Sequence, residues 1–485
     1  MGTRRAHALA IALSGAGFVV LAFGVSAKPP VVKRSAQAFF NFDRPGINAH
    51  NSPAVAADPA RPRTVALADR IDTPLFSCSL SLSRDLGDSW APVKVPLPPD
   101  APNCFWPDVG FDDKGTMLVL YTATGGRFNL PVGVWLQRYN GADPDGPPVR
   151  VAGSEAFHAH LAVEGSDVVI AYVQSTPDNA EKGLGFPTGP NPIMSVRSSD
   201  GGRTFAPAVT VSEPGRRVVV PNVVLGPDGA AVVAALDLGD DVTDYEATHD
   251  GQGGAPDNGH WSIVAYRSDN GGATFSKASL VAGNLVIPQR IIVNLAPVPG
   301  LARDPRSGRL YATWDAGRSD RRDVFVATSG DNGASWTKAV DVVPRKGTQT
   351  LPAVGVAPDG RVDVVFYDRS KDPEDDKTEV AMASSWDEGH TFTTATITDR
   401  AFDSRLGYGS LQGIPVLSSQ LAVLSTPGRA LAFWSDTRRA TQDDNATELA
   451  LAVVRTRHSG GRHPLVAVVG LMALAAGIRL TLRQR

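Results

Sequence analysis

The sequence predicts an all-β protein built from seven similar modules, because two short motifs recur along the chain and the composition favours turns. The chain has 485 residues, of which 42% are hydrophobic and 20% charged. This composition supplies enough apolar residues for a large core. The 48 glycines and 37 prolines suit many tight turns. The net charge of −3 gives no general attraction to nucleic acid or to anionic lipid.

The first motif is an eight-residue turn with the pattern Ser-x-Asp/Asn-x-Gly-x-Ser/Thr-aromatic. Its Asp or Asn side chain can accept hydrogen bonds from the amides of its own turn, and Gly tolerates the positive φ that a tight hairpin requires. The closing Trp or Phe has enough apolar area to hold the turn against neighbouring structure. Recurrence at this spacing predicts a repeat protein. The five copies are Ser83–Trp90, Ser198–Phe205, Ser268–Phe275, Ser329–Trp336 and Ser385–Phe392.

The second motif, a proline followed two residues later by Val or Leu, marks the start of each module. One module has Ala159 in place of the proline. The other six begin at Pro53, Pro107, Pro221, Pro299, Pro352 and Pro415. The eight-residue turn is missing from the second and seventh modules.

An apolar run rich in β-branched residues follows each start and predicts a strand. The seven runs are Thr64–Ala68, Met117–Tyr121, Val168–Tyr172, Ala231–Ala235, Leu310–Trp314, Val362–Phe366 and Ala430–Trp434. We therefore expect seven modules over residues 46–457, with Leu449–Val454 as the last strand and the candidate for closing the repeat.

The eight-residue turn resembles the Asp box of the sialidase-like (BNR-repeat) β-propellers. The resemblance implies a radial propeller in which this turn joins the two outer strands of each blade. With seven modules we expect a seven-bladed β-propeller. Six blades plus an edge element is the alternative, because typical sialidases have six. The segment Gly407–Gly413 with Trp434-Ser-Asp436-Thr-Arg438 is closer to secreted sialidase-like repeat proteins than to proven sialidases.

Both ends of the chain are apolar and predict export with membrane anchoring. Two arginines, an apolar stretch and small residues up to Ala27 favour a signal peptide over 1–27, with an uncleaved anchor helix as the alternative. A linker is expected over 28–45, a stalk over 458–463, a transmembrane anchor over 464–482 and a cytoplasmic tail over 483–485. A hydrophobic tail packed on the protein is the alternative to the anchor. We therefore expect an extracytoplasmic or cell-surface, single-pass membrane protein.

The chain has only two cysteines, Cys78 and Cys104. An exported protein meets an oxidising compartment, so we expect a disulfide between them. It would tie the third strand of the first blade to the start of the second blade. Two buried free thiols are the alternative.

An acid followed by an arginine recurs where the second strands end, in four modules that are consecutive around a closed ring. These residues would form a charged arc on the face of the ring where the second strands end, which also carries the long loops. Arginine offers a planar pair of donors to carboxylates, so the arc predicts a site for an anion or a glycan. A structural Asp–Arg bridge repeated with the blade is the alternative. The residues are Asp69, Arg70, Asp315, Arg318, Asp368, Arg369, Asp436 and Arg438.

A second polar cluster is expected in the slot directly after the proline. This slot holds Asp108, His160 and Asn222 in modules two to four. Polar groups in three adjacent blades could bind a ligand, or they could form a satisfied hydrogen-bond network. His158 and His160 share a strand face, but no third metal ligand is evident, so no metal or other cofactor is expected. Calcium would suit the acidic loop Leu238–His260, although a solvated loop explains its composition equally.

The resemblance implies a specific catalytic set if the chain is a sialidase. Family enzymes use three arginines, a tyrosine nucleophile helped by a glutamate, and an aspartate acid/base. The first arginine of that set is absent here, where Asn51-Ser52-Pro53 replaces Arg-Ile-Pro. Tyr408 is the candidate nucleophile, with no glutamate close in sequence. We therefore expect a surface-anchored propeller that binds glycans or cell-envelope partners, with an exo-acting glycoside hydrolase of sialidase type as the alternative.

Overall fold

The computed structural model describes residues 30–40, 49–72, 75–126, 130–175, 191–213, 215–239, 261–286, 299–318, 321–372, 377–406, 417–418, 420–441 and 446–458. Within these ranges the chain forms strands and one short 3-10 turn, η1 (Ser404–Leu406), and no helix there is long and apolar enough to cross a membrane. The expected signal peptide, anchor and tail lie outside the described residues, as does the expected stalk from residue 459 onward.

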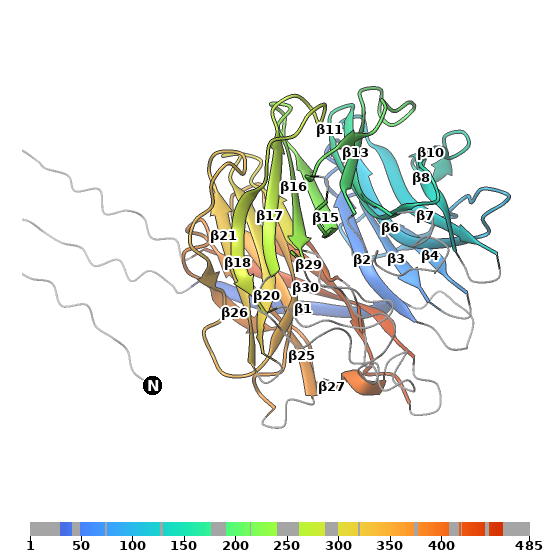
Figure 1. Ribbon diagram of the computed structural model, residues 1–485. Helices are drawn as coiled ribbons and strands as arrows, with labels where there is room; N and C mark the ends of the chain where they lie inside the picture. The colour runs from blue at the N-terminus through green and yellow to red at the C-terminus, as the bar shows by residue number, and fades with distance from the viewer. Residues whose placement is uncertain are drawn as a thin grey trace, which may run out of the picture. The chain divides into compact units, whose positions relative to one another are not determined.

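The described strands form seven antiparallel sheets, which are the predicted blades, so the six-bladed alternative is wrong (Figure 1). Blade one contains β2 (His50–Ala57), β3 (Val65–Ile71), β4 (Ser77–Ser83) and β5 (Ala91–Pro92). Blade two contains β6 (Asn103–Phe111), β7 (Thr116–Gly125), β8 (Leu130–Asn140), β9 (Asp143–Pro144) and β10 (Val149–Ala152). Blade three contains β11 (Ala156–Glu164), β12 (Asp167–Gln174), β13 (Ile193–Ser198) and β14 (Val209–Thr210).

The next three blades continue the same order along the chain. Blade four contains β15 (Val218–Leu225), β16 (Ala231–Asp237), β17 (Trp261–Ser268) and β18 (Ser279–Leu285). Blade five contains β19 (Gly300–Arg303), β20 (Leu310–Arg318), β21 (Arg321–Ser329) and β22 (Val340–Asp341). Blade six contains β23 (Gln349–Val356), β24 (Val362–Asp368), β25 (Lys377–Ser385), β26 (Thr393–Thr396) and β27 (Phe402–Asp403).

Blade seven combines both ends of the described chain. It contains β28 (Ala422–Thr426), β29 (Arg429–Asp436), β30 (Glu448–Arg457) and, outermost, β1 (Val31–Phe40). Residues 31–40 fall in the segment that we expected to be a linker, and the expected closing strand Leu449–Val454 lies inside β30, next to β1. The side chain of Ser35 donates to the Val453 carbonyl at 3.0 Å. The pairing of β1 with β30 stabilises the closed ring, because the two ends of the described chain cannot separate without removing β1 from blade seven.

The ring is closed by contacts between the first strands of neighbouring blades. Each first strand contacts the next one, and β28 of blade seven contacts β2 of blade one. The hydrophobic core is divided accordingly into clusters that lie mainly between adjacent blades, such as the one joining Leu67 of blade one to Leu431 and Leu451 of blade seven. A propeller blade has no complete core of its own, so this arrangement is what its stability requires.

The five eight-residue turns have the geometry that their residue types predict. In the first copy, Gly87 N donates to Ser83 Oγ at 2.8 Å and Ser89 N donates to Asp85 Oδ1 at 2.8 Å. Hydrogen bonds from Ser89 are the main reason that the pKa of Asp85 falls to about 2. Gly87 has φ +84°, and a Cβ there would come within 2.4 Å of a blade-seven leucine side chain. Each turn joins the third strand of its blade to the fourth.

The structure also explains why two modules lack this turn. In blade seven the fourth strand is β1, which comes from the other end of the chain, so no third-to-fourth turn is needed. In blade two, β8 instead folds back through the short strand β9 before β10 pairs with it.

Five first strands begin with the same backbone irregularity. The residue just before the proline slot has a positive φ, the register of the ladder shifts there, and its side chain is buried. These residues are Ser52 (φ 53°), Trp106 (φ 53°), His158 (φ 44°), Val220 (φ 48°) and Leu351 (φ 55°). We call the side of the ring where the first strands begin and the second strands end the top face. The bulges matter for function because they set which side chains meet there.

Candidate functional site on the top face of blades one to three

The predicted acid–arginine pairs do not occupy equivalent positions in their blades. Arg70 pairs across the ladder with Asn51, directly before the left-handed residue of blade one. In blade six the residue at that position is Tyr367, which pairs with Thr350. The pair Asp69–Arg70 is therefore displaced by two residues from Asp368–Arg369, so the pairs do not form an arc of equivalent groups.

The pairs of blades five and six are bonded to nearby backbone and side chains. Asp315 accepts a hydrogen bond from Leu351 N of the next blade at 3.1 Å. Asp368 forms an ion pair with Arg345. Arg369 donates to Thr378 Oγ1 at 3.1 Å and to Ser404 Oγ at 2.9 Å. These contacts fit the structural alternative. The side chain of Arg318 lies outside the described residues.

The sequence pattern missed a second acid of the same kind. Asp237 ends β16 and occupies the same ladder position as Asp368, since it pairs with Val218 as Asp368 pairs with Gln349. It also forms an ion pair with an arginine that precedes its first strand, Arg216. The shared position only becomes visible once the bulges fix the register.

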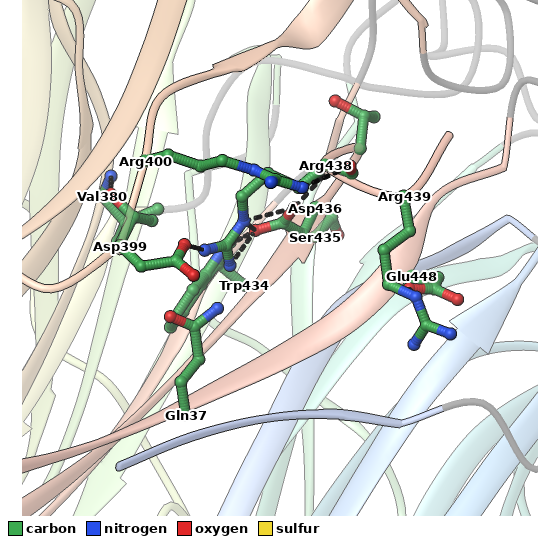
Figure 2. Close-up of polar contacts among 12 residues, drawn as sticks. Gln37, Val380, Asp399, Arg400, Trp434, Ser435, Asp436, Arg438, Arg439 and Glu448 are labelled. Carbon is green, nitrogen blue, oxygen red and sulfur yellow. Dashed lines mark hydrogen bonds and ion pairs between the residues drawn. The ribbon is translucent and has the colours of Figure 1, made fainter. Parts of the chain in front are cut away.

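In blade seven, Asp436 and Arg438 form the expected Asp–Arg bridge (Figure 2). Asp436 accepts hydrogen bonds from Trp434 Nε1 at 2.6 Å and from Arg438 Nε at 2.9 Å. Arg438 also pairs with Asp399, whose side chain is 55% exposed. Burial acts to raise the pKa of Asp399, but Arg438 outweighs it and the pKa lies below its usual value. This arginine is therefore held by two carboxylates.

In blade one, a completely buried arginine has a different environment. Arg70 is 0% exposed, and its Nε lies 2.6 Å from Asp72 Oδ1 while its Nη2 donates to Asp72 Oδ2 at 3.0 Å. Its Cζ lies 4.5 Å from the centroid of the Phe105 ring of blade two. Asp69 does not pair with it, because Asp69 Oδ2 lies 2.6 Å from His50 Nδ1. Among the described residues, Arg70 Nη1 has no hydrogen-bond acceptor.

Blades two and three place the indole ring of Trp106 and the imidazole rings of His158 and His160 near this arginine. Trp106 Nε1 donates to His160 Nε2 at 3.1 Å, so the proton of a neutral His160 is on Nδ1, which lies 3.3 Å from Asp108 Oδ2. The ring of His158 lies 4.5 Å from that of Trp106. Burial, followed by the charges of His160 and Arg70, lowers the pKa of His158 to about 3, so His158 is neutral at neutral pH.

The slot residues of modules two to four join neighbouring blades. Asp108 Oδ2 accepts from Leu161 N of blade three at 3.0 Å, and Asn222 Nδ2 donates to the Pro299 carbonyl of blade five at 3.1 Å. Asp108 and His160 therefore lie in one network with Trp106 between blades two and three, whereas Asn222 belongs to the boundary between blades four and five. This network fits the satisfied alternative that the sequence left open.

We call Arg70, Asp72, Phe105, Trp106, His158 and His160 the Arg70 cluster. Sequence reasoning selected Arg70, His158 and His160 but missed Asp72, Phe105 and Trp106. Phe105 and Trp106 lie beside Arg70 across the boundary between blades, and Asp72 pairs with it within blade one. Cys78 and Cys104, the pair expected to form a disulfide, are bonded to each other beside this cluster. Tyr408 and nearly all of the acidic loop Leu238–His260 lie outside the described residues. Over the described ranges, no three His, Cys, Asp or Glu side chains gather as metal ligands.

The cluster combines groups that suit an anionic, partly apolar ligand. A guanidinium with an N–H that lacks an acceptor can donate to a carboxylate or sulfate oxygen. Phe105 and Trp106 supply flat apolar surfaces beside it. His158 is kept neutral and can exchange a hydrogen bond without adding charge.

Comparisons with known proteins support the fold and nothing finer. No family model and no curated protein matches the chain. Among solved structures, an ulvan lyase of polysaccharide lyase family PL25 matches with a TM-score of 0.51 and 12% identity over 87% of this chain and 98% of that chain. A protein of unknown function from Dyadobacter fermentans matches with a TM-score of 0.47, 13% identity and 88% and 99% coverage. A sialidase from Trypanosoma rangeli has a TM-score of 0.42, 9% identity and 84% and 54% coverage.

The fold and the similarity to the ulvan lyase define the class of protein. The chain is an all-β, seven-bladed β-propeller, a fold that it shares with the ulvan lyase. At 12% identity this likeness establishes the fold alone.

Proposed function

We propose that this chain is an extracytoplasmic β-propeller that binds acidic saccharides, free or in a cell-envelope polymer, at the Arg70 cluster. One observation carries the proposal: the buried guanidinium of Arg70 has an N–H group without an acceptor among the described residues. A buried donor without a partner costs about 1–3 kcal/mol, which an oxygen atom of the ligand would recover. The proposal thus assigns to Arg70 alone the role that the sequence suggested for a larger arc.

The aromatic residues of the cluster support a saccharide rather than a simple inorganic anion. Phe105 and Trp106 flank the guanidinium, with Trp106 6.0 Å from Arg70 Cζ, and a sugar ring presents C–H groups that can pack on such faces. Among propellers of known structure, the ulvan lyase has been seen bound to -[GlcA(1-4)Rha3S]-, a saccharide with both a carboxylate and a sulfate. No residue of the Arg70 cluster is more than 8% exposed, so a ligand can reach Arg70 only if the side chains around it move apart.

Binding is preferred over hydrolysis because the described residues do not assemble a sialidase-type set. Arg70 contributes to the cluster. Arg369 is bonded within blade six, and Arg438 is bonded to Asp436 of its own blade and to Asp399 of blade six. We further propose that the five turns are Asp boxes like those of the sialidase-like propellers. This proposal concerns common ancestry and does not imply sialidase activity. Turnover of a fluorogenic sialoside that is lost in the Tyr408→Phe variant would instead establish the exo-acting glycosidase.

The location of the protein is also a proposal. The disulfide between Cys78 and Cys104 supports an oxidising compartment, because such bonds are rare in the cytosol. We propose that 1–27 directs export and that 464–482 anchors the protein in the membrane. Fractionation of cells that produce the full chain, or the chain shortened to residue 457, tests this. Membrane association that survives the shortening would contradict the anchor.

The binding proposal is tested by calorimetry on the purified full-length protein. The ligands are a uronic-acid oligosaccharide and a neutral oligosaccharide of equal length. We expect the acidic ligand to bind, the neutral one not to bind, and Arg70→Lys to weaken binding about tenfold or more, since lysine cannot reproduce the planar pair of donors. Arg369→Lys is the matched control, because it changes a top-face arginine outside the cluster. Equal affinities of Arg70→Lys and the wild type would contradict the proposal.

A further inference from the structure

The disulfide lies directly against the Arg70 cluster. Cys78 of β4 is the cross-strand neighbour of Arg70 of β3. Cys104 of β6 directly precedes Phe105, the residue whose ring covers the guanidinium. The Cα atoms of the two cysteines are 5.4 Å apart. One covalent bond therefore joins the strand pair that carries Arg70 to the strand that covers it.

On the covering side, non-covalent contacts accompany the disulfide. The rings of Phe76 and Phe105 are 4.9 Å apart, and Cys104 N donates to the Phe76 carbonyl at 3.4 Å, a long hydrogen bond. Trp106 has a positive φ of 53°, which bulky residues rarely adopt. The surrounding structure must therefore hold this backbone in place, and the disulfide at Cys104, two residues away, is one bond that does so.

The other side of Arg70 does not depend on the disulfide. Asp72 holds the guanidinium from within blade one, and Asn51 Nδ2 donates to Asp72 Oδ2 at 2.9 Å. A hydrophobic cluster between blades one and two, which includes Leu80 and Tyr121 as well as Cys104, also keeps the blades together. Loss of the disulfide should thus release the aromatic cover while leaving the ion pair and the fold in place.

We infer that the Cys78–Cys104 disulfide is a positioning element of the Arg70 cluster, so that its redox state sets the affinity of the site. The inference rests on the proposed function for its affinity readout. A dithiol reductant such as dithiothreitol supplies two electrons and two protons. Its thiolate attacks Cys78, which is half-buried, and Cys104, 1% exposed, leaves as a thiolate and takes up a proton. The second thiol of the reductant then releases Cys78 as a thiol and closes the reductant into a cyclic disulfide.

The first readout needs no ligand. Hydrogen exchange is measured on the full-length protein in three forms: oxidised, reduced by dithiothreitol, and the Cys78→Ser/Cys104→Ser double variant. We expect exchange in residues 103–109 to speed up in the last two forms, while the first strands of blades four and six keep their protection. Reductant added to the double variant should change nothing. Unchanged exchange in 103–109 on reduction would overturn the inference.

The second readout is the affinity for the uronic-acid oligosaccharide. We expect about a tenfold loss on reduction, a change that corresponds to about 1.4 kcal/mol. Phe105→Leu, which keeps the disulfide but removes the aromatic cover, should show a similar loss. If the double variant does not fold, the reduced wild type carries the test. If the oxidised protein binds no acidic saccharide, the proposed function fails while hydrogen exchange still decides the positioning role. Full affinity after complete reduction would overturn it.

Discussion

Arg70 in blade one and Arg438 in blade seven both have buried side chains near the end of a second strand, yet their surroundings differ. Arg438 is held by the two carboxylates of Asp436 and Asp399. Arg70 has the single carboxylate of Asp72, and its Nη1 has no acceptor within the described part of the chain. The difference shows that a repeated charged motif has a structural role where other residues of the protein provide partners for all of its charged groups. It becomes a candidate for function where the partners within the protein fall short.

The largest expected effect comes from removing Asp72, the carboxylate that pairs with Arg70 among the described residues. Asp72→Asn leaves a buried guanidinium without a counter-charge, which should lower the free energy of unfolding by about 3–5 kcal/mol. Urea denaturation measures this loss. Asp72→Glu, which keeps the charge, is the control and should recover most of it. A loss below 1 kcal/mol in Asp72→Asn would mean that Arg70 has another counter-charge.

A smaller effect separates the two tryptophans that accompany the arginines. Trp434 Nε1 donates to the carboxylate of Asp436 at 2.6 Å, whereas Trp106 Nε1 donates to the imidazole of His160 at 3.1 Å. A hydrogen bond to a charged group contributes about 1.5–3 kcal/mol and a neutral one about 1 kcal/mol. Denaturation of Trp434→Phe and Trp106→Phe should therefore show the larger loss for Trp434→Phe. The reverse order would contradict our description of the two sites.

A still smaller effect is expected from the second carboxylate of Arg438. Asp399 is largely exposed, and pairs of this kind contribute about 0–1 kcal/mol. Asp399→Asn should therefore leave the denaturation midpoint nearly unchanged, in contrast to Asp72→Asn. Its small contribution should also decrease in high salt, because salt screens exposed pairs. A loss as large as that of Asp72→Asn would remove the distinction between the two arginines.

The smallest expected effects concern how the free energy of unfolding depends on pH near the two arginines. His158 has its pKa lowered from 6.5 to about 3, so the unfolded chain binds a proton near pH 6.5 that the folded protein does not bind until about pH 3. Stability should accordingly fall as the pH decreases through this window. The same sign holds for Asp399 at lower pH: its lowered pKa adds stability above the usual aspartate pKa, and this is lost as the pH falls through the lowered value.

Urea denaturation between pH 4 and about 7 checks the His158 prediction. His158→Gln, which cannot titrate, should show a flatter profile than the wild type across that range. Identical profiles for the two proteins would show that His158 is protonated in the folded state at its ordinary pKa.

The parts of the fold that depend on local sequence could be predicted, and those that depend on distant pairing could not. The turns and proline slots gave the seven blades because each is specified within a few residues. The position of β1 could not be found in this way, since it pairs with β30 more than 400 residues later. The bulges shift the register of the strand pairs, and no residue pattern in the sequence predicts this shift. The alignment of Asp69–Arg70 with Asp368–Arg369 was therefore wrong. The contact between Arg70 and Phe105 crosses two blades and was missed for the same reason.

The most direct measurement follows the guanidinium N–H signals of Arg70 by NMR while a uronic-acid oligosaccharide is added to the full-length protein. Our account predicts that the Arg70 signals shift on saturation, as its Nη1 gains an acceptor, while those of Arg438 stay in place. Ligand binding with no change in the Arg70 signals would contradict the claim that this arginine receives the anion.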